Sequence, residues 1–448
     1  MKPHDFTTRL QQHFEVLGTR LLSELTPGED ATINVSAEET LFIRFNGNRV
    51  RQNTDLTQIT LTLRLQSGGR SVEQSTSLGG DDATDQLAVT RLLARCRSEV
   101  LVLPVDPNQV PIENHGISSE AFRGTLLTPA QLVQAVLAAA DGCDLAGLYA
   151  GGTVIRANRN SKGQRHWFSN ETFFFDYSLY NGPQAAKGCY AGSHWDDAQW
   201  AASLQRTKIM LQLLSKPQQS VRPGAYRCYF APRAFSDLLG MLGWNALSGA
   251  AWKQGRSPFK KLAEKELSLS PLLHIDENFA LGLTPRFNSV GEVSQTCFPL
   301  IEAGEVKTLL VNSRSAKEYG LLANGASDTE APRAMDVRTG LLREQDVLKE
   351  LGTGLYLSNL HYLNWSDPVS ARITGMTRYA CFWVEGGEVV GPIKDMRWDE
   401  SLYDALGSKL MALTTHAEID PAVDTYFQRA LGGSRTPGAL IDQFTFTL

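Results

Sequence analysis

The sequence has few cysteines for its length, and they are scattered. Six occur in 448 residues, with no Cys-x-x-Cys pair. So small and dispersed a set excludes a disulfide framework and predicts free thiols in a reducing compartment. The cysteines are Cys96, Cys143, Cys189, Cys228, Cys297 and Cys381.

Long apolar runs are also absent. The longest uncharged apolar stretch, Leu238 to Trp252, is shorter than the roughly 20 residues that a membrane span needs. The N-terminus, Met1-Lys2-Pro3-His4-Asp5, leads into a charged amphipathic segment and lacks the apolar core of a signal peptide. We therefore expect a cytoplasmic protein that does not associate with membranes.

The chain has no large excess of charge of either sign. It contains 43 basic and 48 acidic residues, which gives a net charge of -5. The protein as a whole therefore has no positive electrostatic field that would attract nucleic acid. Two basic stretches, Arg156 to His166 and Lys253 to Lys265, could locally clamp single-stranded nucleic acid. The negative net charge favours solvated hairpins or loops instead, so we expect no nucleic-acid partner.

Common catalytic motifs are missing. No HExxH or HExxxH zinc motif, phosphate-binding loop with its lysine, GxSxG turn or GxGxxG loop occurs. The most suggestive group of possible metal ligands is His274, Asp276 and Glu277, but an isolated cluster of this kind is more typical of a solvated turn. Cys381 could act as a nucleophile with His361, yet its apolar surroundings favour a buried, inert thiol.

The N-terminal half is rich in regular patterns. Apolar residues at three- and four-residue spacing from Phe6 to Leu25 predict a helix with one buried face. Alternation from Ile59 to Leu65 predicts a half-buried strand, and Asn46-Gly47 predicts a hairpin turn. Ser71 to Leu78 is a further expected strand, and Asp82 to Glu99 a second helix.

The same order of elements then recurs. Thr128-Pro129 predicts the start of a helix, strands follow, and a helix from Asp196 to Ser215 closes the unit. An offset of about 112 residues places Phe173 on Leu61. We therefore predict an α+β fold with an N-terminal domain, residues 1–218, in which a unit of helix, four strands and helix is duplicated. The halves span about 1–100 and 125–216.

Residues 219–448 are expected to form a strand-rich, barrel- or sandwich-like C-terminal domain. Helices are predicted only from Leu238 to Trp252 and from Asp399 to Thr415. The expected strands are Ala225 to Phe230, Cys297 to Ile301, Val306 to Val311 and Ala380 to Val390.

Several segments resemble the TldD/PmbA family. The tract from Cys381 to Ile393, CFWVEGGEVVGPI, is similar to the family's C-terminal signature G-F-W-I-E-N-G-E-I-x-x-P-V. Leu300 to Val306 resembles its L-I-x-x-G-x-L strand, and Ala316 to Gly320 the A-x-x-x-G that follows. Arg44-Phe45-Asn46-Gly47 and Asn160-Ser161-Lys162-Gly163 resemble its N-terminal hairpins. These matches are collinear over most of the chain.

The resemblance implies a dimer. In this family a catalytic TldD subunit carries HExxxH and a zinc-binding cysteine near its C-terminus, and a TldE, or PmbA, partner lacks them. A gapless match that begins at Leu238-Leu239 places Gly240 and Asn245 at the histidine positions and Met241 at the glutamate. No cysteine follows Cys381. The resemblance thus implies no zinc or other cofactor, and a degenerate site on the helix 238–252 in which these three residues face the cleft.

The resulting hypothesis is a non-catalytic TldE-like subunit of a cytoplasmic zinc metallopeptidase complex. Its partners would be a zinc-bearing TldD-like subunit and unfolded proteins or peptides, which it would hold by strand addition. The alternatives are a homodimeric peptide-binding or regulatory protein without proteolytic activity, and a nucleic-acid-binding modulator.

Overall fold

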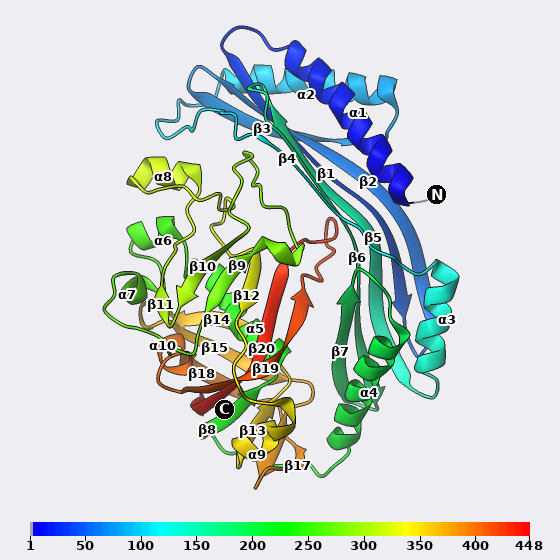
Figure 1. Cartoon of the computed structure of the whole chain (residues 1–448), viewed down its shortest axis with the longest axis vertical. Helices are drawn as coiled ribbons and strands as arrows, with labels where there is room; N and C mark the ends of the chain where they lie inside the picture. Colours follow the sequence, from blue (N-terminus) through cyan, green and yellow to red (C-terminus); the bar gives the residue numbers. More distant parts are fainter. Residues whose placement is uncertain (1–2) are drawn as a thin grey trace.

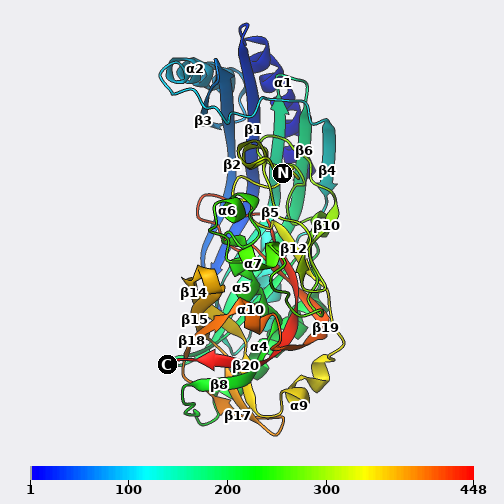
Figure 2. The same ribbon diagram turned by 90° about the vertical axis from the view of Figure 1, so that its left-hand side faces the viewer.

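The computed structural model describes residues 3–448, which form two parts (Figure 1). A long curved sheet with helices at both ends forms the N-terminal part. The C-terminal part, coloured green to red, lies against its concave side. Figure 2 shows the same arrangement from the side. Two sheets combined with helices confirm the predicted α+β class. None of the helices within residues 3–448 is both long and apolar enough to cross a membrane.

The N-terminal part contains a seven-stranded sheet with the order β3-β2-β1-β5-β6-β4, in which β7 also pairs with β6. Neighbouring strands are antiparallel, except that β4 is parallel to β6. The helices are α1 (Pro3–Ser23), α2 (Asp82–Val100), α3 (Pro129–Ala139) and α4 (Asp197–Leu214). The strands are β1 (Glu29–Phe45), β2 (Val50–Ser67), β3 (Arg70–Leu78), β4 (Ile117–Phe122), β5 (Asp144–Asn160), β6 (Arg165–Asn181) and β7 (Gln184–Gly192).

This part contains two units with the same order of elements. Each unit is a helix, three antiparallel strands and a helix, one strand fewer than expected, while β4 lies between the units. The turn from Ser67 to Arg70 corresponds to the turn from Asn181 to Gln184, so the offset is 114 residues rather than 112. An error of two residues is one full period of a strand. The predicted offset therefore still matched the inward-facing side chains of one unit with the inward-facing side chains of the other.

The helices begin where their sequences provide caps. The Asp81 side chain accepts a hydrogen bond from the N–H of Thr84 at the start of α2, and Asp196 does the same for Gln199 at the start of α4. At α3, Thr128 forms a reciprocal capping box with the third helical residue, Gln131. Such caps satisfy N–H groups that have no partner within a helix.

The two faces of the N-terminal sheet have different neighbours. Ile33 and Val35 of β1 lie in the core beneath α1 and α2. The alternate residues point the other way and contact the C-terminal part: Asn34 donates to the carbonyl of Ser289, and Ser36 donates to the side chain of Gln428. The period-two pattern of one strand thus places an apolar core on one face and a polar interface on the other.

The C-terminal part is built on a 13-stranded sheet with the main path β11-β10-β9-β12-β20-β8-β13-β16-β17. Strands β14, β15, β18 and β19 extend it off this path. The strands are β8 (Gly224–Phe230), β9 (Ile275–Asn278), β10 (Cys297–Glu302), β11 (Glu305–Val306), β12 (Ala334–Val337), β13 (Gly354–Leu357), β14 (Asn359–Asp367), β15 (Arg372–Arg378), β16 (Phe382–Glu385), β17 (Glu388–Pro392), β18 (Arg397–Ser401), β19 (Leu410–Pro421) and β20 (Gly433–Phe446).

Short helices connect these strands. They are α5 (Pro232–Gly240), α6 (Gly249–Lys253), α7 (Lys260–Ala263), α8 (Ser313–Tyr319), α9 (Val347–Leu351) and α10 (Leu402–Ala405). Single 3-10 turns occur at η1 (Met241–Gly243), η2 (Phe279–Leu281), η3 (Glu344–Asp346) and η4 (Pro368–Ser370). Helix α5 packs its apolar residues, including Phe235 and Leu238, into the main core of this part.

The predicted helix from Asp399 to Thr415 is wrong. Only α10 is helical there, and β19 begins at Leu410 and pairs with β20. Leucines at helical spacing produced the error. Helix α10 ends at Ala405, two residues before Gly407, where an added Cβ would lie 2.1 Å from the Tyr403 carbonyl oxygen.

The other expected strands vary in accuracy. Strands β8 and β10 agree with prediction. The segment Ala380 to Val390 contains the hairpin β16–β17, because Gly386 and Gly387 both have positive φ angles and form the turn. Only the first residue of the predicted strand Val306 to Val311 belongs to a strand, β11.

Candidate functional site

The segment Leu238 to Trp252 is not one helix, so this prediction is also wrong. Helix α5 ends at Gly240, η1 follows, and a separate helix α6 starts at Gly249. Asn245 lies between them with a left-handed backbone, φ 70°. Asparagine tolerates this conformation, which interrupts a right-handed helix. Ser248 then caps α6 by accepting a hydrogen bond from the Ala251 N–H.

The structure does not bring the three degenerate positions together on one face. Gly240 is exposed at the end of α5, with open space where a Cβ would be. Met241 is 3% exposed and belongs to the core, so it does not face a cleft. Asn245 is exposed and lines a shallow depression with Ser248 and Glu330. Of the three positions, Asn245 is the one that lines this depression.

The carboxylate of Glu330 organises this depression. It accepts hydrogen bonds from the Ser248 hydroxyl at 2.6 Å and from the backbone N–H groups of Ala250 and Asn312 at 2.9 and 3.0 Å. Glu330 therefore joins the starts of α6 and α8. Its role in the structure is to hold the loops that precede these two helices in place.

The cluster of His274, Asp276 and Glu277 is divided by its strand. Asp276 and Glu277 are successive residues of β9 and point to opposite faces. One Glu277 oxygen accepts hydrogen bonds from the backbone N–H groups of Arg333 and Ala334, and burial raises the pKa of Glu277 to about 7. Within residues 3–448, no group of three or more His, Cys, Asp and Glu side chains is placed to hold a metal ion.

Cys381 lies in the core, as predicted. Burial raises its pKa to about 11, so it carries little thiolate near neutral pH. Its Sγ contacts the carbonyl oxygen of Arg378 at 3.3 Å. The expectation of a buried thiol is confirmed.

The basic stretch Arg156 to His166 is neutralised by acidic residues. Arg159 is buried and pairs with Glu15 at 3.1 Å, and Lys162 pairs with Asp30 at 2.6 Å. Arg165 also approaches Glu15, at 3.7 Å. These pairs leave little free positive charge for a phosphate backbone.

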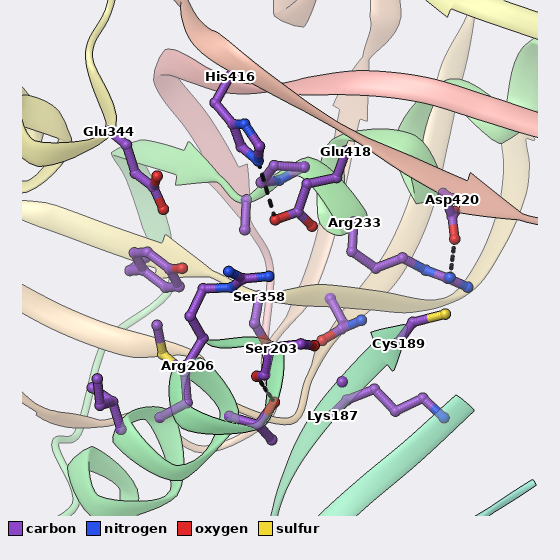
Figure 3. Close-up of a pocket in the computed structure, with 18 of the residues that line it drawn as sticks. Lys187, Cys189, Ser203, Arg206, Arg233, Glu344, Ser358, His416, Glu418 and Asp420 are labelled. Atoms are coloured by element: carbon purple, nitrogen blue, oxygen red, sulfur yellow. Dashed lines mark hydrogen bonds and ion pairs between the residues drawn. The ribbon is translucent and has the colours of Figure 1, made fainter. Parts of the chain in front are cut away.

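A cavity of about 290 Å³ lies between the two parts of the molecule (Figure 3). Strands β6 and β7 and helix α4 contribute one wall. The other wall comes from the β8–α5 connection, η3, the β13–β14 connection and β19. Clefts between domains are common positions for small-molecule sites. We regard this cavity as the candidate functional site.

Ion pairs occupy one side of the cavity. Lys187 contacts Asp176 at 2.6 Å, and Arg233 contacts both Asp420 and Asp237. Ser236 also donates a hydrogen bond to Asp420, at 2.7 Å. Burial raises the pKa of Asp420, although the Arg233 charge and the Ser236 hydrogen bond oppose this rise. These charges are satisfied within the protein.

The other side of the cavity carries charges with weaker or no internal partners. His416 contacts Glu418 at 3.5 Å, and this hydrogen bond raises the pKa of His416. Burial would raise the pKa of Glu418, but His416 and Arg206 lower it overall. Figure 3 shows Arg206 directed toward Glu418, with Glu344 on the same side.

This cavity was not predicted from the sequence. Its lining residues come from segments more than two hundred residues apart, and no local motif connects Arg206 to Glu418. One local signal was present: His416, Glu418 and Asp420 alternate along β19, which is the pattern of a strand with one polar face.

Comparison with known proteins identifies the fold and the family. The chain is similar to the crystal structure of TldE from Thermococcus kodakarensis, with 14% identity, a TM-score of 0.77 and coverage of 97% of this chain and 100% of that chain. A candidate modulator of DNA gyrase from Thermotoga maritima has 14% identity, a TM-score of 0.75 and coverage of 99% and 100%. Another, from Bacteroides thetaiotaomicron, has 14% identity, a TM-score of 0.74 and 98% coverage of both chains.

No curated protein sequence matches the chain. A sequence model of one protein family does match: the PmbA/TldA metallopeptidase C-terminal domain, over residues 223–448. This match covers the entire C-terminal part and half of the chain, and it agrees with the full-length structural similarity. The chain therefore belongs to the PmbA/TldD family.

Proposed function

We propose that this protein is a non-catalytic, TldE-like subunit of a cytoplasmic TldD-type zinc metallopeptidase complex that acts on unfolded proteins or peptides. The observation that carries the proposal is the whole-length similarity to a protein named TldE, with 97% of this chain and all of that chain aligned. Both parts of the molecule, and not only the family's C-terminal domain, take part in this similarity.

The sequence supports a role without catalysis. A zinc protease of this family needs a histidine followed directly by glutamate, so that the metal and the base that activates its water lie side by side. None of the eight histidines precedes a glutamate. The segment that aligns with the motif is interrupted by η1 and the left-handed Asn245. A zinc-bearing partner would therefore supply the chemistry.

Strand β14 supports a role in peptide binding. Within the described chain it pairs only with β15, so its other edge is free of strand partners. Apart from the Leu360 N–H, which donates to the Asp237 carboxylate at 3.0 Å, such an edge presents backbone N–H and C=O groups to which an extended peptide can add as a further strand, independently of its sequence.

Reconstitution tests the proposal. The chain would be purified alone and after co-expression with a zinc-bearing TldD-like subunit from the same genome. We expect the isolated chain to contain no stoichiometric zinc and to cleave no peptide, and the co-expressed proteins to form a stable complex that cleaves an unfolded substrate. Measurements are metal content by mass spectrometry, complex mass by light scattering and peptide release by chromatography.

Two outcomes would contradict the proposal. Stoichiometric zinc and peptidase activity in the isolated chain would make it a catalytic subunit. A partner that is fully active and monodisperse without this chain would remove its role in the complex. In that second case, a homodimer that binds peptide without cleavage would be the function to test next.

A further inference from the structure

The cavity between the two parts is lined by a buried polar side chain that has no hydrogen-bond partner within residues 3–448. The side chain of Asn359 is 8% exposed and makes no hydrogen bond to another described residue, although it lines the cavity. The hydroxyl of Tyr229, in a residue that is 4% exposed, is also unpaired within the described chain. Neither side chain has a polar atom that is completely sealed from solvent without a partner. A molecule in the cavity could therefore bond to Asn359, whereas the Tyr229 hydroxyl lies against Gly438, which is not part of the cavity wall.

Burying polar groups of this kind costs free energy unless they form hydrogen bonds. Removing an amide or hydroxyl from bulk water without replacing its hydrogen bonds is unfavourable, so buried polar side chains almost always have partners. The neighbouring Ser203 and Thr207 follow that rule, since both contact the hydroxyl of Tyr177. Asn359, on the opposite wall, has no such partner in the described chain, and a ligand in the cavity would offer it one.

The unpaired charges beside the cavity have both signs. Arg206 and Glu344 are both exposed and form no ion pair within 4.0 Å in the described chain. Glu418 contacts His416 at 3.5 Å and is also affected by the Arg206 charge. In Figure 3, Arg206, Glu344 and Glu418 surround one region of the cavity. A ligand there meets one guanidinium and two carboxylates.

This combination of charges selects among ligand classes. A simple anion would find Arg206 but would be repelled by Glu344 and Glu418. A simple cation would be held by the carboxylates and opposed by Arg206 and by His416, whose pKa is raised toward the charged form. A molecule with both an ammonium and a carboxylate group avoids both conflicts, because each of its ends can face an opposite charge.

The size of the cavity limits the ligand further. A volume of about 290 Å³ is at the lower end of the range for small-molecule sites. It fits an amino acid or a very short peptide and excludes a folded chain.

We propose that this cavity binds a small zwitterion, a free amino acid or dipeptide, whose carboxylate faces Arg206 and whose ammonium group faces Glu344 and Glu418, with Asn359 hydrogen-bonded to its polar core. The site adjoins the start of β14, since Asn359 is the first residue of that strand. It stands on the cavity alone and does not depend on the peptidase complex.

Calorimetric titration of the full-length protein tests the proposal. The probes are alanine, alanyl-alanine, N-acetyl-alanyl-alanine and alanyl-alanine amide. We expect saturable binding of alanine or alanyl-alanine, and roughly tenfold or greater weakening when either end of the dipeptide is blocked, because each block removes one charge-assisted contact. Absence of binding by both unblocked probes at millimolar concentration would overturn the proposal. Unchanged affinity for the amide would indicate a simple cation site and would also overturn it.

Matched variants connect the binding to the cavity. Arg206→Gln and Glu344→Gln are each expected to weaken the binding of the unblocked probe by roughly tenfold. Arg91 is the tenth residue of α2, as Arg206 is of α4, but lies outside the cavity, so Arg91→Gln is the control for the arginine. Glu350→Gln is the corresponding control for Glu344.

Because these four side chains are exposed, the substitutions should leave the fold intact, which thermal melts would check. Asn359→Leu is the buried variant and is expected to reduce binding as well. Equal affinity in the Arg206, Glu344 and control variants would place the ligand elsewhere and overturn the assignment.

Discussion

The backbone N–H of Arg429 donates to the carboxylate of Glu38, at 3.3 Å from each oxygen, and this contact joins the two parts of the molecule. Glu38 lies on the concave face of β1, and Arg429 lies in the connection from β19 to β20. Both are buried. The guanidinium of Arg429 also donates to the carbonyl of Gly152 and to the hydroxyl of Thr172, at 3.1 and 3.0 Å. This connection is therefore anchored in the middle of the N-terminal sheet.

Substitution at this anchor should destabilise the docking of the two parts. Burial lowers the pKa of Arg429 to about 10, which reflects the cost of holding its charge away from water. In Glu38→Ala that charge loses the carboxylate that opposes this cost, so we expect a loss of about 3–5 kcal/mol in the free energy of unfolding. Chemical denaturation measures this loss. Tyr426→Ser, in the exposed part of the same connection, is the control and should change stability by less than about 0.5 kcal/mol. Equal effects of the two variants would contradict the role of the anchor.

Rebuilding the zinc motif should fail. The variant Gly240→His/Met241→Glu/Asn245→His restores the three residue types, but Met241 lies in the core and Asn245 has a left-handed backbone. An unpaired carboxylate at position 241 should cost more than about 3 kcal/mol of stability. We expect a destabilised protein without stoichiometric zinc, as measured by thermal melting and metal analysis.

Gly240→His alone provides the control for this experiment. Its Cβ would enter open space, so the single variant should melt close to the parent protein. A stable triple variant that binds zinc at a 1:1 ratio would show that this segment can adopt the widened helix required for HExxxH. The gapless alignment of this segment with HExxxH would then correspond to a real structural equivalence.

The sequence was sufficient for features that depend on neighbouring residues. The first helix, the alternating strands and the duplication follow from periodicity, and Thr128-Pro129 marks the start of α3 correctly. It failed where local patterns conflict with packing. Leu402, Leu406 and Leu410 have helical spacing, yet Leu410 begins a strand because pairing with β20 outweighs that spacing. In such cases pairing with strands distant in the sequence, and not local spacing, determines the secondary structure.

The same reason explains why the candidate site was missed. Arg206, Glu344 and Asn359 lie in separate elements of the two parts, and only the docking of these parts makes them neighbours. Each side chain by itself is an ordinary polar residue. Apolar periodicity predicts which face of an element is buried, but it does not predict which polar side chains from other elements will meet there.

Glu277 should make stability depend on pH in a defined direction. Burial raises its pKa from 4.5 to about 7, so the folded state holds a proton more tightly than the unfolded state. Its contribution to stability is fully present below about pH 4.5 and decreases as the pH rises through 7. Glu277→Gln keeps an oxygen that can accept from Arg333 and removes the charge. Near pH 8 we expect the variant to be more stable than the parent by about 2–3 kcal/mol, with little difference at pH 4.5.

Thermal melts from pH 4.5 to 8.5 would measure this difference. Exposed Glu350→Gln is the control and should leave the pH dependence of the parent unchanged. A Glu277→Gln variant whose stability relative to the parent does not vary with pH would show that the carboxylate is solvated or paired in solution.

The paired basic stretch should not bind nucleic acid. Arg159 and Lys162 already contact Glu15 and Asp30, so phosphate binding would require breaking these pairs. Fluorescence anisotropy with single-stranded DNA should therefore show no saturable binding at physiological salt. A protein that neutralises several phosphates instead loses affinity steeply between about 50 and 200 mM salt. If such salt-sensitive binding occurs, the variants Lys162→Ala and Lys261→Ala distinguish the two basic stretches, since only the variant in the stretch that binds DNA would reduce the dependence of affinity on salt. The hypothesis of a nucleic-acid-binding modulator would then replace that of a peptidase subunit.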